Sequence, residues 1–343
     1  MKIGLVGYQG SGKSALFEWL TGIRPDPALA HASQAAMTPV PEPRVEQLSA
    51  IYHPKKITLA SLEVVDTAGL SRTHEGNAAK LAAIREAGCM VLVIGAFQSG
   101  CDPLAEMATF EEDQLLADLD IVSGRVERLR ESTKKPKPNR DAELVELAAL
   151  EPLVGVLESG KRLHTVQMTD DQMKATRSFR LLTEKPRLIL FNVADDEAKP
   201  ERFGAKLPAD VQSVAVPVGL ELELARMSPE DRAAFREEMG LASYDRDGLL
   251  RKLLDLSGQM LYFTAGEKEV RTWMLRQGGT ALEAAANIHT DLARGFIRAE
   301  TMKVADLVRL GSEREIKAAG LVRQEPKDYV IQDGDILNIR FSV

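Results

Sequence analysis

Apolar stretches and amphipathic stretches alternate along the first 97 residues of the chain. Residues 2–6 form a short apolar run typical of a buried strand, and residues 14–20 have the spacing of an amphipathic helix. Further strands are predicted over residues 57–65 and 90–94, with a helix over residues 77–87 between them. Strands that alternate with helices predict an α/β fold, in which a mostly parallel sheet has helices on both faces.

The alternation stops between residues 111 and 180. Leucine and valine recur there at helical spacing in two stretches, on either side of a Pro- and Lys-rich break at residues 134–138. This pattern predicts an antiparallel helical hairpin inserted into the α/β domain. Strand patterns return at residues 187–191 and 211–218.

Short strand-like runs and turns follow from Tyr262 onward and predict a small α+β module. We therefore expect an α/β domain made of residues 1–110 and 181–261, a helical insertion at residues 111–180 and a C-terminal domain at residues 262–343. A chain of 343 residues is long enough to bury more than one core.

The charge balance limits the possible partners. The chain has 44 basic and 51 acidic residues and a net charge of −7, which excludes a globally basic nucleic-acid binder, so we expect no DNA partner. One local patch is basic: residues 125–140 contain seven basic residues and two acidic ones. This patch is either a solvated helix tip or a contact for the phosphate backbone of RNA.

Cysteine content and hydropathy indicate a cytoplasmic protein. Cys89 and Cys101 have neither the number of a disulfide framework nor the spacing of metal ligands. The longest strongly apolar run, near residues 90–97, is much shorter than a membrane span. We therefore expect no membrane association.

The candidate chemistry begins directly after the first predicted strand. Residues 7–14 fit the phosphate-binding pattern G-x-x-x-x-G-K-[ST] and lie between a strand and a helix, which is the context that a P-loop requires. Lys13 is expected to reach the β- and γ-phosphates and the Ser14 hydroxyl to bind Mg²⁺. The phosphate-binding residues predicted here are Gly10, Ser11, Gly12, Lys13, Ser14 and Ala15.

A D-x-x-G pattern ends the strand predicted over residues 57–65. Asp66 is placed to help hold Mg²⁺, and the N–H of Gly69 can contact the γ-phosphate. The alternative is an ordinary turn that closes a strand. Between the two motifs, residues 22–36 lack periodicity and form a loop that can become ordered when nucleotide binds.

A third pattern concerns the base of the nucleotide. Asn192, Val193 and Asp195 are predicted to bind the nucleotide, because they follow the strand at residues 187–191 at the place where guanine-binding switch proteins have N-K-x-D. Val193 replaces the lysine, so guanine selectivity does not follow, and ATP and GTP both remain possible ligands.

Eight segments of the chain carry a family resemblance: TPVPEPR at 38–44, DTAGL at 66–70, LLADLD at 115–120, LTEKP at 182–186, FTAGEKEVRTW at 263–273, IHTD at 288–291, GFIRAE at 295–300 and KDYVIQDGD at 327–335. With these segments the chain resembles the Obg-like ATPase or YchF family of translation-factor-class P-loop proteins, which carry a C-terminal ubiquitin-like TGS domain. The resemblance implies a Mg²⁺-dependent nucleotide triphosphatase that prefers ATP to GTP and associates with ribosomes.

The chain departs from the family pattern at the predicted site. Asp195 stands where the family has Glu, and Pro217 stands where a serine is usual. The stretch 70–77 is shorter than in the family, and the histidine-bearing loop after the third strand is missing at residues 95–103.

Leu70 occupies the position of the water-orienting Gln of Ras-like enzymes, so hydrolysis is expected to be slow. His74 is a candidate replacement for the missing histidine, although a lone loop histidine is more often simply solvated.

The sequence thus predicts a purine-nucleotide-dependent switch and slow nucleoside triphosphatase that acts on ribosomes through the hairpin tip and the C-terminal domain. The alternative is a nucleotide-gated binding module with GTP specificity or negligible hydrolysis.

Overall fold

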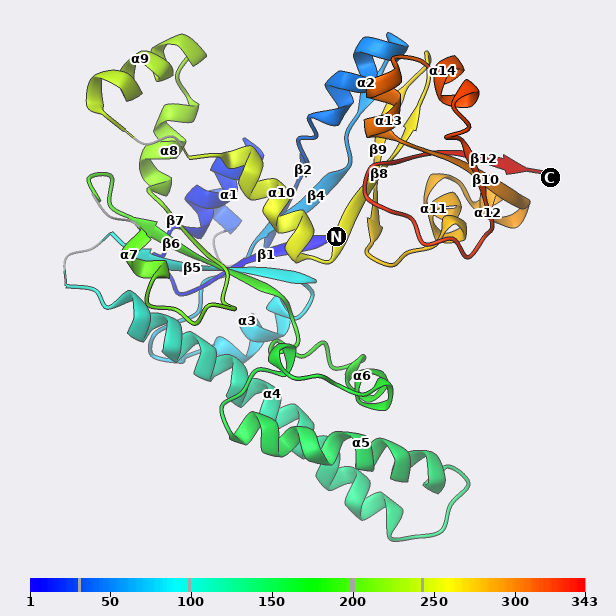
Figure 1. Cartoon of the computed structure of the whole chain (residues 1–343). Helices are drawn as coiled ribbons and strands as arrows, with labels where there is room; N and C mark the ends of the chain where they lie inside the picture. The colour runs from blue at the N-terminus through cyan, green and yellow to red at the C-terminus, as the bar shows by residue number, and fades with distance from the viewer. Residues whose placement is uncertain (30–31, 98–99, 198–200, 242–243, 343) are drawn as a thin grey trace. The chain divides into compact units, whose positions relative to one another are not determined.

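The computed structural model describes residues 1–29, 32–97, 100–197, 201–241 and 244–342 (Figure 1). The predicted α/β fold is confirmed. Five strands of the first sheet, β4, β1, β5, β6 and β7, are parallel, and β2 lies at its edge. The order is β2 (Gln34–Pro39), β4 (Ser61–Asp66), β1 (Lys2–Val6), β5 (Cys89–Ala96), β6 (Arg187–Val193) and β7 (Ser213–Val216).

Helices cover both faces of this sheet, as the alternating pattern predicted. On one face α1 lies beside α8, whereas α3, the first turns of α4 and α7 cover the other face (Figure 1). The bounds of these elements and of their neighbours are α1 (Lys13–Thr21), η1 (Pro27–Leu29), α3 (Asn77–Ile84), α7 (Glu201–Gly204), α8 (Val218–Ala225) and α9 (Pro229–Met239).

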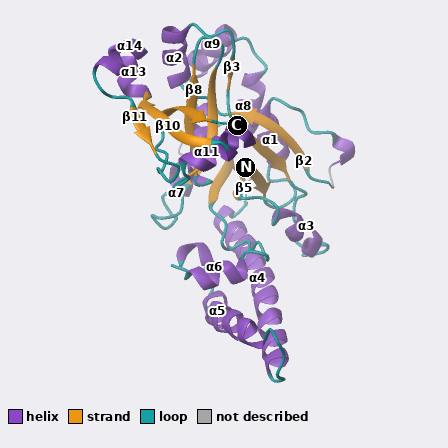
Figure 2. Cartoon of the chain, turned by 90° about the vertical axis from the view of Figure 1, so that its right-hand side faces the viewer, coloured by secondary structure: helices purple, strands orange, loops and turns teal. Residues whose placement is uncertain are grey.

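The predicted hairpin is formed by two long helices, α4 (Pro103–Thr133) and α5 (Arg140–Glu158), which lie side by side in Figure 2. Asp102 starts α4 earlier than the periodicity predicted, because its carboxylate accepts hydrogen bonds from the N–H groups of Leu104 and Ala105, both at 3.1 Å. Apolar side chains from both helices close the hairpin core: Val122, Val126, Leu129, Leu150, Leu153 and Leu157.

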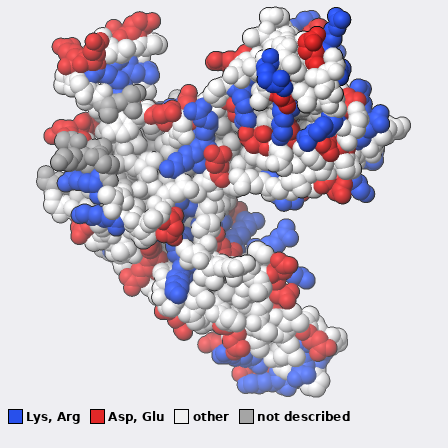
Figure 3. Space-filling model, in the orientation of Figure 1, with Lys and Arg blue, Asp and Glu red and all other residues white. Residues whose placement is uncertain are grey.

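Two short elements, η2 (Leu163–Thr165) and α6 (Asp170–Thr176), lead the chain from the hairpin back to the sheet. Basic side chains gather at the free end of the hairpin, in the lower part of Figure 3. This is the patch that the sequence predicted between residues 125 and 140.

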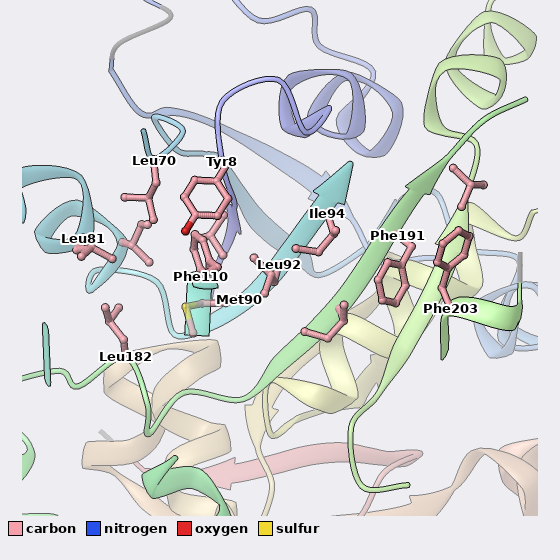
Figure 4. Packing of buried hydrophobic residues seen from close by; sticks show 14 residues of the cluster. Tyr8, Leu70, Leu81, Met90, Leu92, Ile94, Phe110, Leu182, Phe191 and Phe203 are labelled. Atoms are coloured by element: carbon pink, nitrogen blue, oxygen red, sulfur yellow. The ribbon is translucent and has the colours of Figure 1, made fainter. Parts of the chain in front are cut away.

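Aromatic and aliphatic side chains join the P-loop to the sheet and to α4 (Figure 4). The ring of Tyr8 meets the ring of Phe110 edge to face, with 5.6 Å between the ring centroids. Phe191 stacks on Phe203 of α7 at 5.3 Å. Because Tyr8 is itself part of the P-loop, this core fixes the loop relative to α4.

The second sheet belongs to the C-terminal α+β module. Its strand order is β11 (Arg323–Glu325), β10 (Phe296–Lys303), β12 (Asp335–Phe341), β8 (Gln259–Ala265), β9 (Val270–Arg276) and β3 (Ile57–Thr58). The accompanying helices are α2 (Arg44–Tyr52), α10 (Arg246–Leu256), α11 (Ala281–Ile288), α12 (Thr290–Arg294), α13 (Val304–Leu310) and α14 (Glu313–Ala318).

The chain divides into two compact units, one of Met1–Ala36 and Glu63–Tyr244, the other of Met37–Leu62 and Asp245–Val343. Contacts explain why residues 37–62 belong with the C-terminal module. Ile57 pairs with Val270 of β9, and the Tyr52 hydroxyl donates to Glu313 at 2.8 Å. The sequence analysis places residues 37–62 and 245–261 in the α/β domain. The predicted domain limits concern regions that fold independently, and they stay a prediction.

Two local expectations were wrong. The single strand predicted over residues 57–65 is two strands, because β3 pairs with β9 whereas β4 pairs with β1. The strand predicted over residues 211–218 ends at Val216, since Pro217 stands at the N-cap of α8. Of the helices that the structure describes, none combines the length and the apolar character needed to span a bilayer.

The burial of Cys89 gives a direct test of the first core. Burial raises the pKa of the Cys89 thiol to about 12, whereas Cys101 is exposed. Only one thiol of the native protein should therefore react rapidly with Ellman's reagent, with the second slower by at least ~100-fold. Denaturant should release both, and the single fast thiol should disappear in Cys101→Ser. Two rapidly reacting thiols in the native protein would contradict the buried position of β5.

Candidate nucleotide-binding site

The P-loop requires glycine at two positions, where a side chain would collide with two different neighbours. Gly7 has a φ of +146°, and a Cβ there would collide with the carbonyl oxygen of Val93. Gly12 has a φ of +97°, and a Cβ there would collide with the amide of Asn192. The backbone of the loop can therefore stay close to β5 and β6, with the N-terminus of α1 directly behind it.

Lys13 is held inside this loop. Its side chain is buried, and its Nζ donates a hydrogen bond to the carbonyl oxygen of Tyr8 at 2.8 Å. Burial lowers the pKa of Lys13 to about 8, although the carboxylates of Asp66 and Glu106 oppose the shift. The site thus contains a buried cation whose charge a polyphosphate would stabilise.

Ser14 and Asp66 meet beside Lys13, as the two motifs predicted. The Ser14 hydroxyl donates to Oδ2 of Asp66 at 2.6 Å. Burial raises the pKa of Asp66, whereas the Ser14 hydrogen bond and the charge of Lys13 lower it. Oδ1 of Asp66 is buried and has no hydrogen-bond partner among the described residues.

This oxygen set fits Mg²⁺, which prefers a few protein oxygens together with phosphate and water. A cage of three or more His, Cys, Asp or Glu side chains is absent from the described part of the chain. The remaining ligands of such an ion would therefore come from nucleotide and water.

The D-x-x-G turn is joined to the P-loop by its backbone. The N–H of Leu70 donates to the carbonyl of Gly7 at 3.0 Å, and the N–H of Gln9 donates to the carbonyl of Leu70 at 2.9 Å. A Cβ added at Gly69 would lie 2.8 Å from Nζ of Lys13, so Gly69 is directly beside that lysine. The two motifs therefore form one continuous surface.

A cavity of about 560 Å³ opens over these residues. Its lining includes part of the predicted site and part of the predicted loop at residues 22–36, of which residues 30 and 31 lie outside the described residues. The lining residues are Gln9, Gly10, Lys13, Ser14, Ala15, Glu18, Arg24, Pro25, Asp26, Pro27, Ala32, Gln34, Asp66, Thr67, Ala68, Gly69, Lys80 and Leu222.

Ser11 and Gly12 do not line this cavity. Ser11 is fully buried, and its Oγ has no hydrogen-bond partner among the described residues. Both residues lie at the back of the loop, where Asn192 packs.

Asn192, at the end of the strand predicted to precede the base-binding motif, links the P-loop to the start of α8 by hydrogen bonds. Its Nδ2 donates to the carbonyl of Ser11 at 3.1 Å, and its Oδ1 accepts from the N–H of Val218 at 3.1 Å. Val193 is buried in the core, so its side chain does not cover a base. Asp195 is exposed and lies near Gly219 in the first turn of α8.

Leu70 and His74 both lie outside the cavity lining. Leu70 is 0% exposed and packs in the core near Tyr8 (Figure 4). His74 is 59% exposed, and its Nδ1 is 3.0 Å from a carboxylate oxygen of Asp113 on α4. The structure therefore places neither side chain beside the predicted phosphate position, and the catalytic role of His74 stays a prediction.

The short connection between β5 and α4 includes residues 98 and 99, which lie outside the described residues. Phe97 before them is exposed, and Asp102 after them caps α4.

Sequence reasoning missed two cations near the phosphate loop. Lys80 of α3 lines the cavity, and its Nζ donates to the carbonyl of Gly69 at 2.8 Å. Arg72 donates to the carbonyl of Gln9 at 3.0 Å and to Glu106 of α4 at 2.6 Å. No motif spacing marks either residue, because both reach the site through the fold of the segment after Gly69.

Two family models match the chain. One, described as a 50S ribosome-binding GTPase, matches residues 2–123. The other is a YchF-type GTPase C-terminal model, described as a protein of unknown function, and it matches residues 260–342.

Full-length relatives extend this likeness. The chain is 34% identical to the ribosome-binding ATPase YchF of Haemophilus influenzae over 363 residues, covering 100% of this chain and 99% of the relative. It is 34% identical to the protein of the same name from Bacillus subtilis over 366 residues, covering 99% of both chains. It is also 34% identical to Obg-like ATPase 1 of Oryza sativa subsp. japonica, covering 100% of this chain and 92% of the relative.

A solved structure agrees with the sequence relatives. The Schizosaccharomyces pombe YchF GTPase superposes with a TM-score of 0.86 at 25% identity, covering 99% of this chain and 97% of that chain. Both the sequence likeness and the structural likeness therefore extend over nearly the entire chain. The chain belongs to the YchF/Obg-like ATPase family.

Proposed function

We propose that this protein is a nucleotide-dependent switch that binds and slowly hydrolyses a purine nucleoside triphosphate, with ATP preferred to GTP. The observation that carries the proposal is the convergence of Lys13, Ser14 and Asp66 on one cavity, with a buried and unpartnered oxygen on Asp66. A buried cation next to a hydroxyl–carboxylate pair suits a triphosphate with its Mg²⁺ ion.

The proposed chemistry is phosphoryl transfer to water. The oxygen of water bonds to the γ-phosphorus while the bond to the β–γ bridging oxygen breaks, and that oxygen leaves on the diphosphate with the electron pair. One proton of water stays on the released phosphate and the other passes to solvent. Lys13 stabilises charge on the β- and γ-phosphates, and Gly69 provides a backbone contact to the γ-phosphate.

Ser14 and Asp66 would hold the Mg²⁺ ion, which supplies additional neutralisation of phosphate charge when bound. The Ser14 hydroxyl and the Asp66 carboxylate are already in contact, so the donor set needs little rearrangement. The remaining N–H groups from Gly10 to Ala15 orient the phosphates at the N-terminus of α1.

Slow turnover is proposed because the two side chains considered for positioning the attacking water do not line the cavity. Leu70 is packed in the core, and His74 contacts Asp113. Without a polar side chain from either residue, water is positioned less well than in enzymes with a Gln at this place.

The ATP preference rests on family membership and on the inward position of Val193. Guanine recognition uses a long side-chain stem over the base, and Val193 lies in the core instead. Asp195 is the polar residue of this motif that is exposed near α8. We infer that base selection depends mainly on Asp195 and on backbone groups at the start of α8.

Steady-state turnover of the wild-type protein with ATP and with GTP tests the enzymatic half of the proposal, with Lys13→Ala as the blank. We expect slow hydrolysis and a higher kcat/KM for ATP. Turnover no faster than the blank with either nucleotide would defeat the hydrolase assignment.

A second candidate function is a nucleotide-gated binding module with little hydrolysis. The positions of Leu70 and His74 favour it, because neither side chain is among the described residues that line the cavity. Tight binding of ATP without product formation would favour this module over the enzyme.

We further propose that the protein associates with ribosomes, as the names of its bacterial relatives state for them. The hairpin tip and the C-terminal domain are the surfaces proposed for this contact. At the tip, several basic residues are paired with acidic ones of the same hairpin. These pairs are Arg125–Glu146, Arg130–Glu151, Lys134–Glu131 and Lys137–Glu143.

Charge reversal of two free tip residues tests this contact. Arg128 and Lys135 are exposed and have no ion-pair partner among the described residues. The double variant Arg128→Glu/Lys135→Glu should reduce cosedimentation with ribosomes at least ~10-fold at low salt, because phosphate contacts dominate such binding. The matched control reverses Lys174 and Arg177 near α6. If the tip variant cosediments with ribosomes as well as the control variant does, the tip is only a solvated surface.

A further inference from the structure

Lys80 is a cavity-lining cation that the P-loop and D-x-x-G motifs do not account for. It lies in α3, and its Nζ donates to the carbonyl of Gly69 at 2.8 Å. Gly69 is also directly beside Nζ of Lys13, where an added Cβ would lie 2.8 Å away. Both lysines thus approach the same glycine, one at its carbonyl and one at its Cα.

The fold holds Lys80 in this place. Asn77 is buried at the start of α3, accepts from the N–H of Ser71 at 2.8 Å and donates to the carbonyl of Ser71 at 2.9 Å. Leu81 and Ile84 anchor the helix in the core. These contacts fix α3 against the segment that follows Gly69, so the ammonium of Lys80 is directed to the cavity without a loop having to close.

The ammonium group of Lys80 has more N–H donors than its hydrogen bond to Gly69 uses. An ammonium group carries three N–H donors, and the hydrogen bond to Gly69 uses one of them. No other partner for Nζ of Lys80 lies among the described residues. The other two donors are therefore available to an anion in the cavity.

The charges around the cavity favour an anion at this point. Glu18, Arg24 and Asp26 line the cavity beside α1 and the following loop. Lys13 and Lys80 both approach Gly69, where the nearest carboxylate in the lining is that of Asp66 beside Lys13, so the two cations outnumber it. Glu18 is already paired with Arg226 at 2.8 Å. The positive part of the cavity is thus at Gly69, where the γ-phosphate is proposed to lie.

We propose that Lys80 contacts the γ-phosphate and stabilises the charge that develops on it during hydrolysis. The inference rests on the proposed function and extends it, because it supplies a charged group where Leu70 cannot act. The contact depends on the γ-phosphate alone, so Lys80 discriminates nucleoside triphosphate from diphosphate as well as aiding turnover.

Substitutions that separate charge from hydrogen bonding test this role. Lys80→Ala removes both, Lys80→Gln keeps a donor for the Gly69 carbonyl without the charge, and Lys80→Arg keeps the charge. We expect Ala and Gln to lower kcat at least ~30-fold and the ratio of ATP affinity to ADP affinity ~10-fold, since charge-assisted contacts typically contribute this much. Lys80→Arg should recover a substantial part of both.

Binding of ADP with aluminium fluoride provides a readout that is independent of turnover. Ala and Gln should lose this complex, while ADP alone binds within ~2-fold of wild type. Lys174→Ala is the matched control for removal of an exposed lysine, and thermal melting checks that each variant is folded.

The outcomes distinguish this inference from the function on which it rests. If Lys80→Gln has the kcat and the ATP-to-ADP affinity ratio of wild type, Lys80 serves only to hold the Gly69 turn by a hydrogen bond, and the proposal is overturned. Unchanged kcat and affinity ratio in Lys80→Ala overturn it as well. If the wild type binds ATP without hydrolysing it, hydrolysis fails as a function, and the affinity ratio still decides the role of Lys80. If no nucleotide binds, both proposals fall.

Discussion

Replacement of Lys13 by alanine is expected to weaken ATP binding by at least ~100-fold and to remove measurable turnover. Nζ of Lys13 gives one hydrogen bond to Tyr8 and keeps two donors for phosphate. Hydrogen bonds to charged groups contribute about 1.5–3 kcal/mol each, so the loss of two corresponds to at least ~100-fold in affinity. Isothermal titration of the variant with ATP measures the effect directly.

The nucleotide-free Lys13→Ala variant should remain folded. Burial of the Lys13 ammonium without an anion is unfavourable, which is why the pKa of this lysine falls to about 8. Removal of the charge should therefore leave the melting temperature of the nucleotide-free protein nearly unchanged or slightly raised. An ATP affinity within ~3-fold of wild type would show that Lys13 does not face the phosphates.

Substitution of Asp118 by alanine is expected to destabilise the N-terminal unit by about 3–5 kcal/mol, as the loss of one partner from a buried ion pair usually does. The Asp118 carboxylate is fully buried. It accepts from Arg85, the C-cap residue of α3, at 2.5 Å, and from both the N–H and the hydroxyl of Thr183, at 2.7 and 2.8 Å. Alanine would remove the acceptor of both Thr183 donors and would leave Arg85 as an uncompensated charge, with hydrogen bonds among the described residues only to the carbonyls of Ala117 and Arg180.

Thermal and urea denaturation measure this effect. For a unit of this size, such a loss lowers the melting temperature by roughly 10 °C. Asp120→Ala is the matched control, because Asp120 is on the same helix two residues later and is exposed. Equal stability of the two variants would contradict the view that Asp118 fastens the root of the hairpin to α3.

The parts of the fold that are local in sequence could be predicted from it. The strand–loop–helix order around Lys13 and the helical spacing before and after residues 134–138 both depend on neighbouring residues. The convergence of Ser14 with Asp66 was also predictable, because strands β1 and β4 carry the two motifs at the same end of a parallel sheet.

The rest depends on pairing between distant segments, which periodicity does not report. β3 consists of two residues and pairs with β9 more than 200 positions later, so no local pattern assigns it to the C-terminal module. Lys80 was missed for a similar reason, because its approach to Gly69 depends on how α3 packs. The motif places Val193 among the predicted nucleotide-binding residues, whereas the burial of its side chain depends on core packing that the motif does not report.

The most direct test of the account is a calorimetric titration of the nucleotide-free wild-type protein with ATP and with GTP in the presence of Mg²⁺. We predict saturable binding of one ATP per chain, weaker binding of GTP, and a loss of the ATP signal in Lys13→Ala. Absence of binding by both nucleotides would contradict the nucleotide site itself, and tighter binding of GTP would contradict the proposed ATP preference.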